Sequence, residues 1–152
     1  MKPKKGITIL ALVVVVSFAY CSMNAAPLIS DEKYTYISGM MWYKKYDEGQ
    51  AVAAEQDKPV MVYFWAIWCK FCRTLHEDVY PDAEISKILG EDFVLVAVDL
   101  DENKTDAQRF GVQYPPYLIF LDSQGKVLRA DPGFMSKEQL LAVLKQVKEG
   151  KA

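Results

Sequence analysis

The sequence has few of the residues that hold metals or build disulfide scaffolds: its 152 residues include three cysteines and one histidine. Three cysteines are too few for a small secreted domain held together by disulfides, and an odd number does not pair fully. A structural zinc site takes four ligands, whereas Cys69, Cys72 and His76 supply three at most. A carboxylate such as Glu77 or Asp78 would have to complete the set, so the sequence gives poor support to a metal site.

An excess of positive charge is also lacking. Lysine and arginine number 18 against 20 acidic residues, the formal net charge is −2, and no basic stripe is visible. Because nucleic-acid-binding domains usually carry such a stripe, no nucleic-acid partner is expected. Apolar residues make up 51% of the chain. That is enough for one hydrophobic core that needs no disulfides, and the length indicates one domain with a short extra segment.

No uncharged apolar run reaches the length of a full membrane span. The run near the N-terminus covers residues 7–20 and directly follows a cluster formed by Lys2, Lys4 and Lys5. A bilayer span needs about 20 residues, so this run is short. A basic start followed by a short apolar stretch is typical of an export signal. We therefore assign residues 1–26 to a signal peptide or to a membrane or lipid anchor.

Three fates of this segment are consistent with the sequence. Cys21 follows the apolar run and resembles the lipid-modified cysteine of bacterial lipoproteins, although Tyr20 and Phe18 depart from that pattern. Cleavage after Ala25 or Ala26 would release a soluble form. An uncleaved segment would anchor the chain in the membrane. All three place the domain outside the cytoplasm, either secreted, periplasmic or tethered at the cell surface.

The remainder divides into a tether over residues 27–45, which has no clean period, and a domain over residues 46–152. Trp42 and Tyr43 are expected to pack on that domain. Hydrophobic periodicity and turn residues predict its elements. Helices are expected at 46–56, after Cys69 as far as Val79, at 82–90, at 103–111 and at 136–150; strands are expected at 60–66 and 93–101, followed by a hairpin of 117–122 and 126–130.

This order of elements predicts the fold class. Strands that alternate with helices argue for an α/β layer fold in which some strands are parallel. The hairpin near the end adds an antiparallel edge. The two apolar runs at 60–66 and 93–101 have no polar alternation, as expected for strands buried on both faces.

The stretch WCKFC, residues 68–72, has several interpretations. Covalent haem attachment requires histidine after the second cysteine, and Arg73 stands there. A structural disulfide between such close neighbours closes a very small loop and adds little stability. A reactive dithiol fits the context best, because the pair follows a buried strand and opens a helix.

A helix start has physical consequences for the first cysteine. Free N–H groups and the positive end of the helix dipole favour an anion there, so the pKa of Cys69 should be lowered. Cys72, one turn deeper, would resolve the mixed disulfide that Cys69 forms. Lys70 adds positive charge. Trp68 and Phe71 would form an apolar rim that holds a peptide.

Two segments in this order resemble the thioredoxin superfamily: FWAIWCKFC, and the later FGVQYPPYLIFLDSQGKVL. The likeness covers about residues 42–149. The intervening LHEDVYPDAEISKILGEDFVLVAVDLDEN is similar to the exported thiol-disulfide interchange subgroup, which includes the C-terminal domain of membrane electron-transfer reductases. The resemblance implies a thioredoxin fold, with a central mixed β-sheet flanked by helices.

The resemblance also implies roles for individual residues. Cys69 would be the nucleophile, Cys72 the resolving cysteine and Trp68 the flanking aromatic residue. Pro116 would be the cis-proline that faces the two sulfurs. Pro115 would present its backbone to a bound peptide, but it has no N–H and offers only its carbonyl.

One position departs from the thioredoxin pattern. The buried acid that commonly lies beneath the cysteines aligns with Tyr63, and its lysine partner aligns with Ala97. The proton relay that assists Cys72 is therefore missing or built differently. His76, Glu77 or the hydroxyl of Tyr63 could replace it, and His76 follows Cys72 by four residues, on the same helix face.

The sequence thus predicts an extracytoplasmic thiol-disulfide oxidoreductase of the reductase or isomerase type. It would act as a monomer on protein thiols and disulfides, with the Cys69–Cys72 disulfide in place of any other cofactor. A membrane or soluble dithiol would supply electrons. The alternative is a non-enzymatic thioredoxin-fold module that binds a client protein, or a metal such as copper through Cys69, Cys72 and His76.

Overall fold

The computed structural model describes residues 32–150, and the predicted signal or anchor at 1–26 lies outside this range. Its elements, in chain order, are β1 (Tyr34–Ile37), β2 (Met40–Tyr43), α2 (Tyr46–Gln56), β3 (Val60–Trp65), α3 (Lys70–Thr74), the π-helix η1 (Leu75–Val79), α4 (Ala83–Asp92), β4 (Val94–Asp99), α5 (Lys104–Phe110), β5 (Tyr117–Leu121), β6 (Val127–Pro132) and α6 (Lys137–Lys148). No helix in the described range is both long and apolar enough to cross a bilayer.

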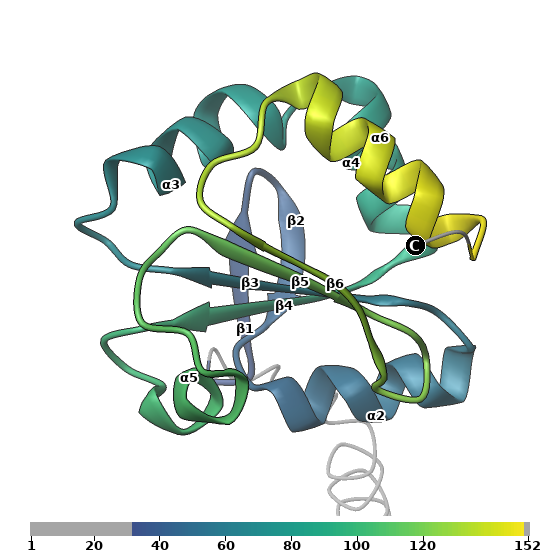
Figure 1. Ribbon diagram of the computed structural model, residues 1–152, viewed down its shortest axis with the longest axis horizontal. Helices are drawn as coiled ribbons and strands as arrows, with labels where there is room; N and C mark the ends of the chain where they lie inside the picture. The colour runs from purple at the N-terminus through teal and green to yellow at the C-terminus, as the bar shows by residue number, and fades with distance from the viewer. Residues whose placement is uncertain (1–31, 151–152) are drawn as a thin grey trace, which may run out of the picture. The chain divides into compact units, whose positions relative to one another are not determined.

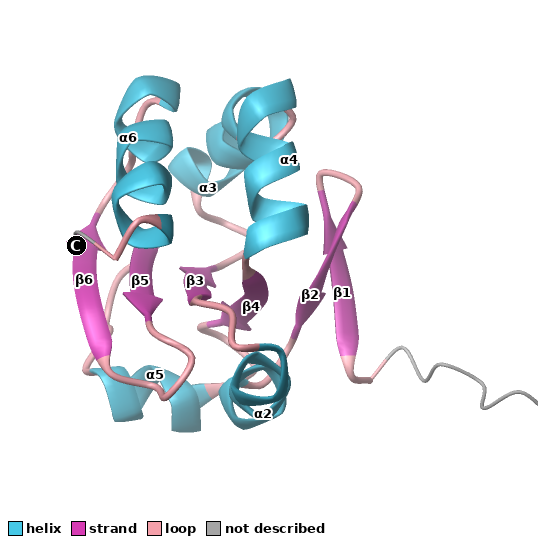
Figure 2. Cartoon of the chain, turned by 90° about the vertical axis from the view of Figure 1, so that its right-hand side faces the viewer, coloured by secondary structure: helices cyan, strands magenta, loops and turns pink. Residues whose placement is uncertain are grey.

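The strands form one mixed sheet in the order β1-β2-β4-β3-β5-β6. β4 is parallel to both β2 and β3, whereas β5 is antiparallel to β3 and to β6. Helices α2 and α5 cover one face of the sheet, and α3, α4 and α6 cover the other (Figures 1 and 2). The predicted α/β fold with a mixed sheet between helices is confirmed.

The two central strands are the apolar runs that the sequence marks as buried on both faces. Residues 60–64 of β3 are fully buried, and no residue of 94–98 in β4 is more than 5% exposed. Successive side chains of a strand point to opposite faces. Met61 and Tyr63 accordingly join the core under α3, α4 and α6, while Val62 and Phe64 join the core against α2 and α5.

The predicted tether at 27–45 is wrong for residues 34–43, which form the β1–β2 hairpin of the sheet. Ser38 and Gly39 both have positive φ, of 52° and 77°, as a tight two-residue hairpin turn requires. Strands of four residues are too short to show a period in the sequence. The expected burial of Trp42 and Tyr43 is confirmed, since they are 0% and 9% exposed.

Side chains cap the first turns of two helices, and one predicted helix end is wrong. Asp82 accepts the N–H groups of two residues at the start of α4, and Ser136 forms a capping box with Gln139 at the start of α6. Helix α4 was expected to end at Gly90 but continues to Asp92. Gly90 has no positive φ, so it is an ordinary helical residue and not a terminator.

Candidate active site

The loop between β3 and α3 places Cys69 at the start of a helix, as predicted. Cys69 is the N-cap of α3, with extended backbone angles of φ −79° and ψ 106°. Its Sγ accepts a hydrogen bond from the backbone N–H of Cys72 at 3.1 Å. Its own N–H donates to the carbonyl of Ala66 at 3.1 Å, which closes the loop after the strand. This backbone arrangement holds the first sulfur where N–H groups are free to stabilise negative charge.

The two cysteines are joined by a disulfide, with Cα atoms 5.2 Å apart. Cys69 is 7% exposed and Cys72 is 1% exposed. Both residues are buried, and Cys69 is the more exposed of the two. Both cysteines belong to the core that contains Tyr63 and Tyr80.

Aromatic and aliphatic side chains surround the exposed side of this loop. Trp68 and Phe71, both predicted as rim residues, are 63% and 58% exposed. The indole Nε1 of Trp68 donates to the carboxylate of Asp101 at 2.8 Å, which fixes the ring over the loop after β4. Phe71 contacts Phe134, with ring centroids 6.0 Å apart. Lys70, also predicted near the site, is exposed on the first turn of α3.

The sequence interpretation missed three residues beside the disulfide, and two of them have no local signal. Asp101 and Phe134 come from loops far along the chain, and no local pattern marks them as neighbours of the cysteines. Ile67, which precedes Trp68, is 78% exposed. An isoleucine beside a CxxC motif in an exposed loop is a signal that the sequence did offer.

The peptide bond between Pro115 and Pro116 is cis, as predicted. Pro116 is buried, and its carbonyl accepts the N–H of Gly133 at 2.9 Å. Strand β5 begins at the next residue, where Tyr117 pairs with Phe64 near the end of β3. The diproline therefore lies at the same edge of the sheet as the loop that carries the cysteines.

Tyr63, which aligns with the buried acid of thioredoxins, is fully buried, and its cross-strand partner is Ala97, as the sequence indicated. The Tyr63 hydroxyl lies 3.1 Å from Nε2 of His76. Burial raises the pKa of Tyr63 well above its ordinary value and lowers the pKa of His76. Two of the three candidates to replace the missing acid are thus brought together. The third, Glu77, is exposed on η1 and is not a buried acid.

The copper set predicted from Cys69, Cys72 and His76 is not assembled. The two sulfurs are bonded to each other, and His76 directs Nε2 to Tyr63. Within residues 32–150, no three histidine, cysteine, aspartate or glutamate side chains are grouped so as to hold a metal ion.

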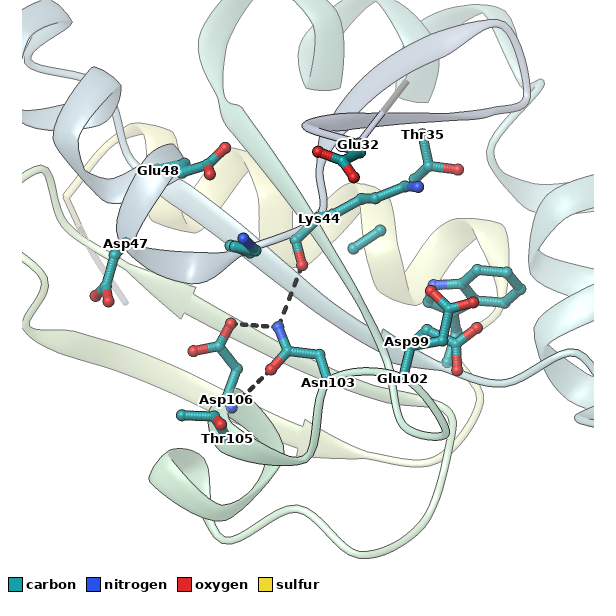
Figure 3. Close-up of a pocket in the computed structure, with 13 residues that line it drawn as sticks. Glu32, Thr35, Lys44, Asp47, Glu48, Asp99, Glu102, Asn103, Thr105 and Asp106 are labelled. Carbon is teal, nitrogen blue, oxygen red and sulfur yellow. Dashed lines mark hydrogen bonds between the residues drawn. The ribbon is translucent and has the colours of Figure 1, made fainter. Parts of the chain in front are cut away.

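A cavity of about 870 Å³ lies apart from the disulfide (Figure 3). Neither cysteine lines it, and most of its charged side chains are acidic: Glu32, Asp47, Glu48, Asp99, Glu102 and Asp106. Asp106 is 6% exposed and accepts hydrogen bonds from the N–H of Tyr46 and from the amide of Asn103. The Asn103 amide also donates to the carbonyl of Lys44. These bonds join α5 to the junction of β2 and α2, which is a structural task.

A comparison of the sequence with models of protein families identifies the same fold. The model of the Thioredoxin-like domain matches residues 46–148. The chain belongs to the thioredoxin-like family. This membership together with the bonded cysteine pair makes the thioredoxin-like chain a thiol-disulfide oxidoreductase.

Relatives of this thioredoxin-like chain fall into two groups. The thioredoxin of Alicyclobacillus acidocaldarius subsp. acidocaldarius is 33% identical over 97 residues, which are 62% of this chain and 87% of that protein. The thiol:disulfide interchange protein DsbD of Campylobacter jejuni strain RM1221 is 35% identical over 88 residues, which are 55% of this chain and 15% of that protein. The match to DsbD thus concerns a small part of a much longer protein.

A solved structure agrees with these sequence matches. The solution structure of a thioredoxin from Thermus thermophilus superposes with a TM-score of 0.64 at 28% identity. The aligned region covers 73% of this chain and 88% of that one.

Proposed function

We propose that this thioredoxin-like chain works outside the cytoplasm as a protein-disulfide reductase or isomerase. Cys69 is the nucleophile in this proposal, and Cys72 is the resolving cysteine. The observation that carries it is the unequal exposure of the two cysteine residues, 7% for Cys69 and 1% for Cys72. The Sγ of Cys69 also accepts the N–H of Cys72. The sulfur that a client reaches first is thus the one whose thiolate the helix start stabilises.

The reaction follows from these roles. In the reduced protein, the Cys69 thiolate attacks one sulfur of a client disulfide, and the other client sulfur leaves as a thiolate that takes up a proton. Cys72 then loses its proton and attacks the Sγ of Cys69, which breaks the mixed disulfide and releases the second client thiol. Two electrons pass to the client, and the Cys69–Cys72 disulfide forms. A membrane or soluble protein dithiol then reduces this disulfide and returns the chain to its starting state.

The exposed rim supports a polypeptide client. Trp68, Phe71 and Ile67 present apolar surface beside Cys69, and the hydrogen bond to Asp101 holds the indole in place. Apolar surface of this kind binds extended or unfolded segments, which are the segments whose disulfides are accessible. The carbonyl of Pro115, at the same edge of the sheet, is the expected backbone partner of that segment.

Two sequence features support this proposal. Residues 1–26 have the layout of an export signal, with three lysines before an uncharged apolar run, which supports a location outside the cytoplasm. The match to a thiol:disulfide interchange protein supports the exchange of thiols and disulfides. We propose a monomer that is either secreted or held at the membrane by this segment, with lipid on Cys21 as one form of the anchor.

Insulin reduction in the presence of dithiothreitol tests the proposed activity. The full chain should accelerate the precipitation of insulin chains, and Cys69→Ser should abolish the acceleration. Cys72→Ser should accumulate mixed disulfides with clients in intact cells, which mass spectrometry would identify. Cys21→Ser is the matched control, because it removes a cysteine outside the motif and should leave insulin reduction unchanged. Faster alkylation of Cys72 than of Cys69 at neutral pH would contradict the assigned roles.

A further inference from the structure

We propose that Tyr63 and His76 form a relay that accepts the proton of Cys72 when this cysteine resolves the mixed disulfide. The inference rests on the proposed function and extends it to a step for which no acid or base has been assigned. The pair is defined by the 3.1 Å contact between the Tyr63 hydroxyl and Nε2 of His76. In place of a buried carboxylate, the pair offers a phenol and an imidazole.

The relay lies on the correct side of the sheet. Tyr63 is fully buried on β3, and its core cluster contains both cysteines, of which Cys72 is the less exposed at 1%. His76 follows Cys72 by one helical turn, where residues four apart share a face. A hydroxyl from the sheet and an imidazole from the helix therefore meet at the core that contains the resolving cysteine.

No carboxylate competes for this task among the residues that the structure describes. The buried charged residue in this part of the chain is Asp106, which is bonded to Tyr46 and Asn103. Tyr46 belongs to the core on the opposite face of the sheet, under α2 and α5. A proton that leaves Cys72 toward the interior thus meets phenol and imidazole groups and no buried acid.

The surroundings of His76 keep its backbone and ring in place. The hydroxyl of Ser38, at the tip of the β1–β2 hairpin, donates to the His76 carbonyl at 2.6 Å. The ring stacks on Tyr80 with centroids 6.1 Å apart and contacts Trp65 at 5.7 Å. η1 is a π-helix, a rare form that often occurs at functional sites. The N–H of Tyr80, the residue after η1, donates to the carbonyl of Leu75 at 2.8 Å.

The titratable groups that face His76 carry no charge at neutral pH. They are the phenols of Tyr63, from β3, and Tyr80, which follows η1, and burial raises the pKa of both. Ser38, from the β1–β2 turn, and Trp65, from β3, do not titrate in this range. Burial lowers the pKa of His76 itself, so the imidazole is neutral and able to accept a proton.

The proposed step balances its protons. The Cys72 thiol gives its proton to the Tyr63 oxygen while the Tyr63 hydroxyl proton moves to Nε2 of the neutral imidazole. The Cys72 thiolate attacks the Sγ of Cys69, and the client leaves as a thiolate. The imidazolium then returns its proton to the departing client thiolate or to water. Tyr63 is unchanged at the end, and the step requires the tautomer of His76 that carries its hydrogen on Nδ1.

Single-turnover reduction of glutathione disulfide by the reduced full chain separates the two chemical steps. Attack by Cys69 depends on the glutathione disulfide concentration, whereas resolution by Cys72 is intramolecular and sets the rate at saturation. Acid quenching and mass spectrometry measure the mixed disulfide between the two steps. Because general acid-base catalysis contributes roughly 100- to 10,000-fold, we expect resolution near neutral pH to slow by about tenfold or more in His76→Gln and in Tyr63→Phe. The bimolecular step should stay unchanged.

Tyr80→Phe is the matched control. It removes a second buried hydroxyl next to the same imidazole, one that has no hydrogen-bond partner within the described range. Its resolution rate and pH profile should equal those of the parent chain. An equal loss in all three variants would mean a structural role and would overturn the relay. Unchanged resolution in both His76→Gln and Tyr63→Phe would overturn it as well.

A second measurement gives the pKa of Cys72 and does not depend on turnover. In a Cys21→Ser, Cys69→Ser background, Cys72 is the one remaining cysteine, and the pH dependence of iodoacetamide alkylation gives its pKa. Adding His76→Gln or Tyr63→Phe should raise this pKa, and adding Tyr80→Phe should not. An unchanged Cys72 pKa would count against the relay, whereas failure of the parent chain to reduce any disulfide would count against the proposed function alone.

Discussion

Two glycines lie inside helices of this protein, and the same substitution should have opposite effects at the two positions. Gly49 is buried in α2, and a Cβ there would lie 2.3 Å from Cγ2 of Val96 on β4. Carbon atoms in contact are about 3.5–4.0 Å apart, so alanine at 49 would overlap β4. Gly90 is exposed in α4, and a Cβ there meets nothing within 4 Å.

The magnitudes follow from two opposing effects. Alanine is more favourable than glycine inside a helix by about 1 kcal/mol, because it loses less backbone entropy on folding. Overpacking a buried contact costs about 1–3 kcal/mol. Gly90→Ala has only the first effect and should raise the free energy of unfolding by about 0.5–1 kcal/mol. Gly49→Ala has both effects and should lower it by up to about 2 kcal/mol.

Urea unfolding of the oxidised full chain, followed by far-ultraviolet circular dichroism, measures both changes. Val96→Ala removes the methyl groups that alanine at 49 would meet. In that background, Gly49→Ala should cease to destabilise and should recover the helical gain. If Gly49→Ala stabilised the parent chain as much as Gly90→Ala does, the close approach of α2 to β4 would be wrong.

Three further predictions concern the polar groups of the fold and the rim. Asp106→Ala leaves the buried N–H of Tyr46 without an acceptor and removes one of the two acceptors of the Asn103 amide, so the free energy of unfolding should fall by roughly 1–3 kcal/mol in urea titrations. Burial lowers the pKa of His76, so below about pH 6.5 the unfolded chain binds a proton that the folded chain resists. Stability should therefore decrease from about pH 7 to pH 5, and urea titrations of His76→Gln should show a shallower decrease. Asp101→Ala removes the acceptor of the Trp68 indole; tryptophan fluorescence anisotropy should fall and KM for insulin should rise, whereas unchanged values would mean that this bond does not hold the rim.

Much of the fold could be predicted because its strongest elements depend on local patterns. β3 and β4 are continuous apolar runs, and the helices carry their own start signals, such as Asp82 and the capping box of Ser136 and Gln139. Such features involve residues within a few positions of one another. The β1–β2 hairpin could not be predicted, because its four-residue strands are stabilised by the pairing of β2 with β4, more than 50 residues away along the chain.

The candidate site divides in the same way. The spacing of Cys69 and Cys72 and their place after a buried strand depend on adjacent residues, and the structure has them at the start of α3 as predicted. Glu77 is close to the cysteines in sequence, but its exposure on η1 rules it out as a buried acid. Asp101 and Phe134 join the rim only because loops distant in sequence meet at one edge of the sheet.

The sequence by itself determined that this chain has a reactive cysteine pair at a strand-to-helix junction, because consecutive residues form the strand, the loop and the helix start. Only the tertiary structure decided what lies beneath that pair. Tyr63 and His76 are thirteen residues apart, on a strand and a helix whose relative placement depends on the whole core. Whether their polar atoms meet at hydrogen-bond distance depends on the packing of that helix on the sheet, and the local sequence does not encode such a distance.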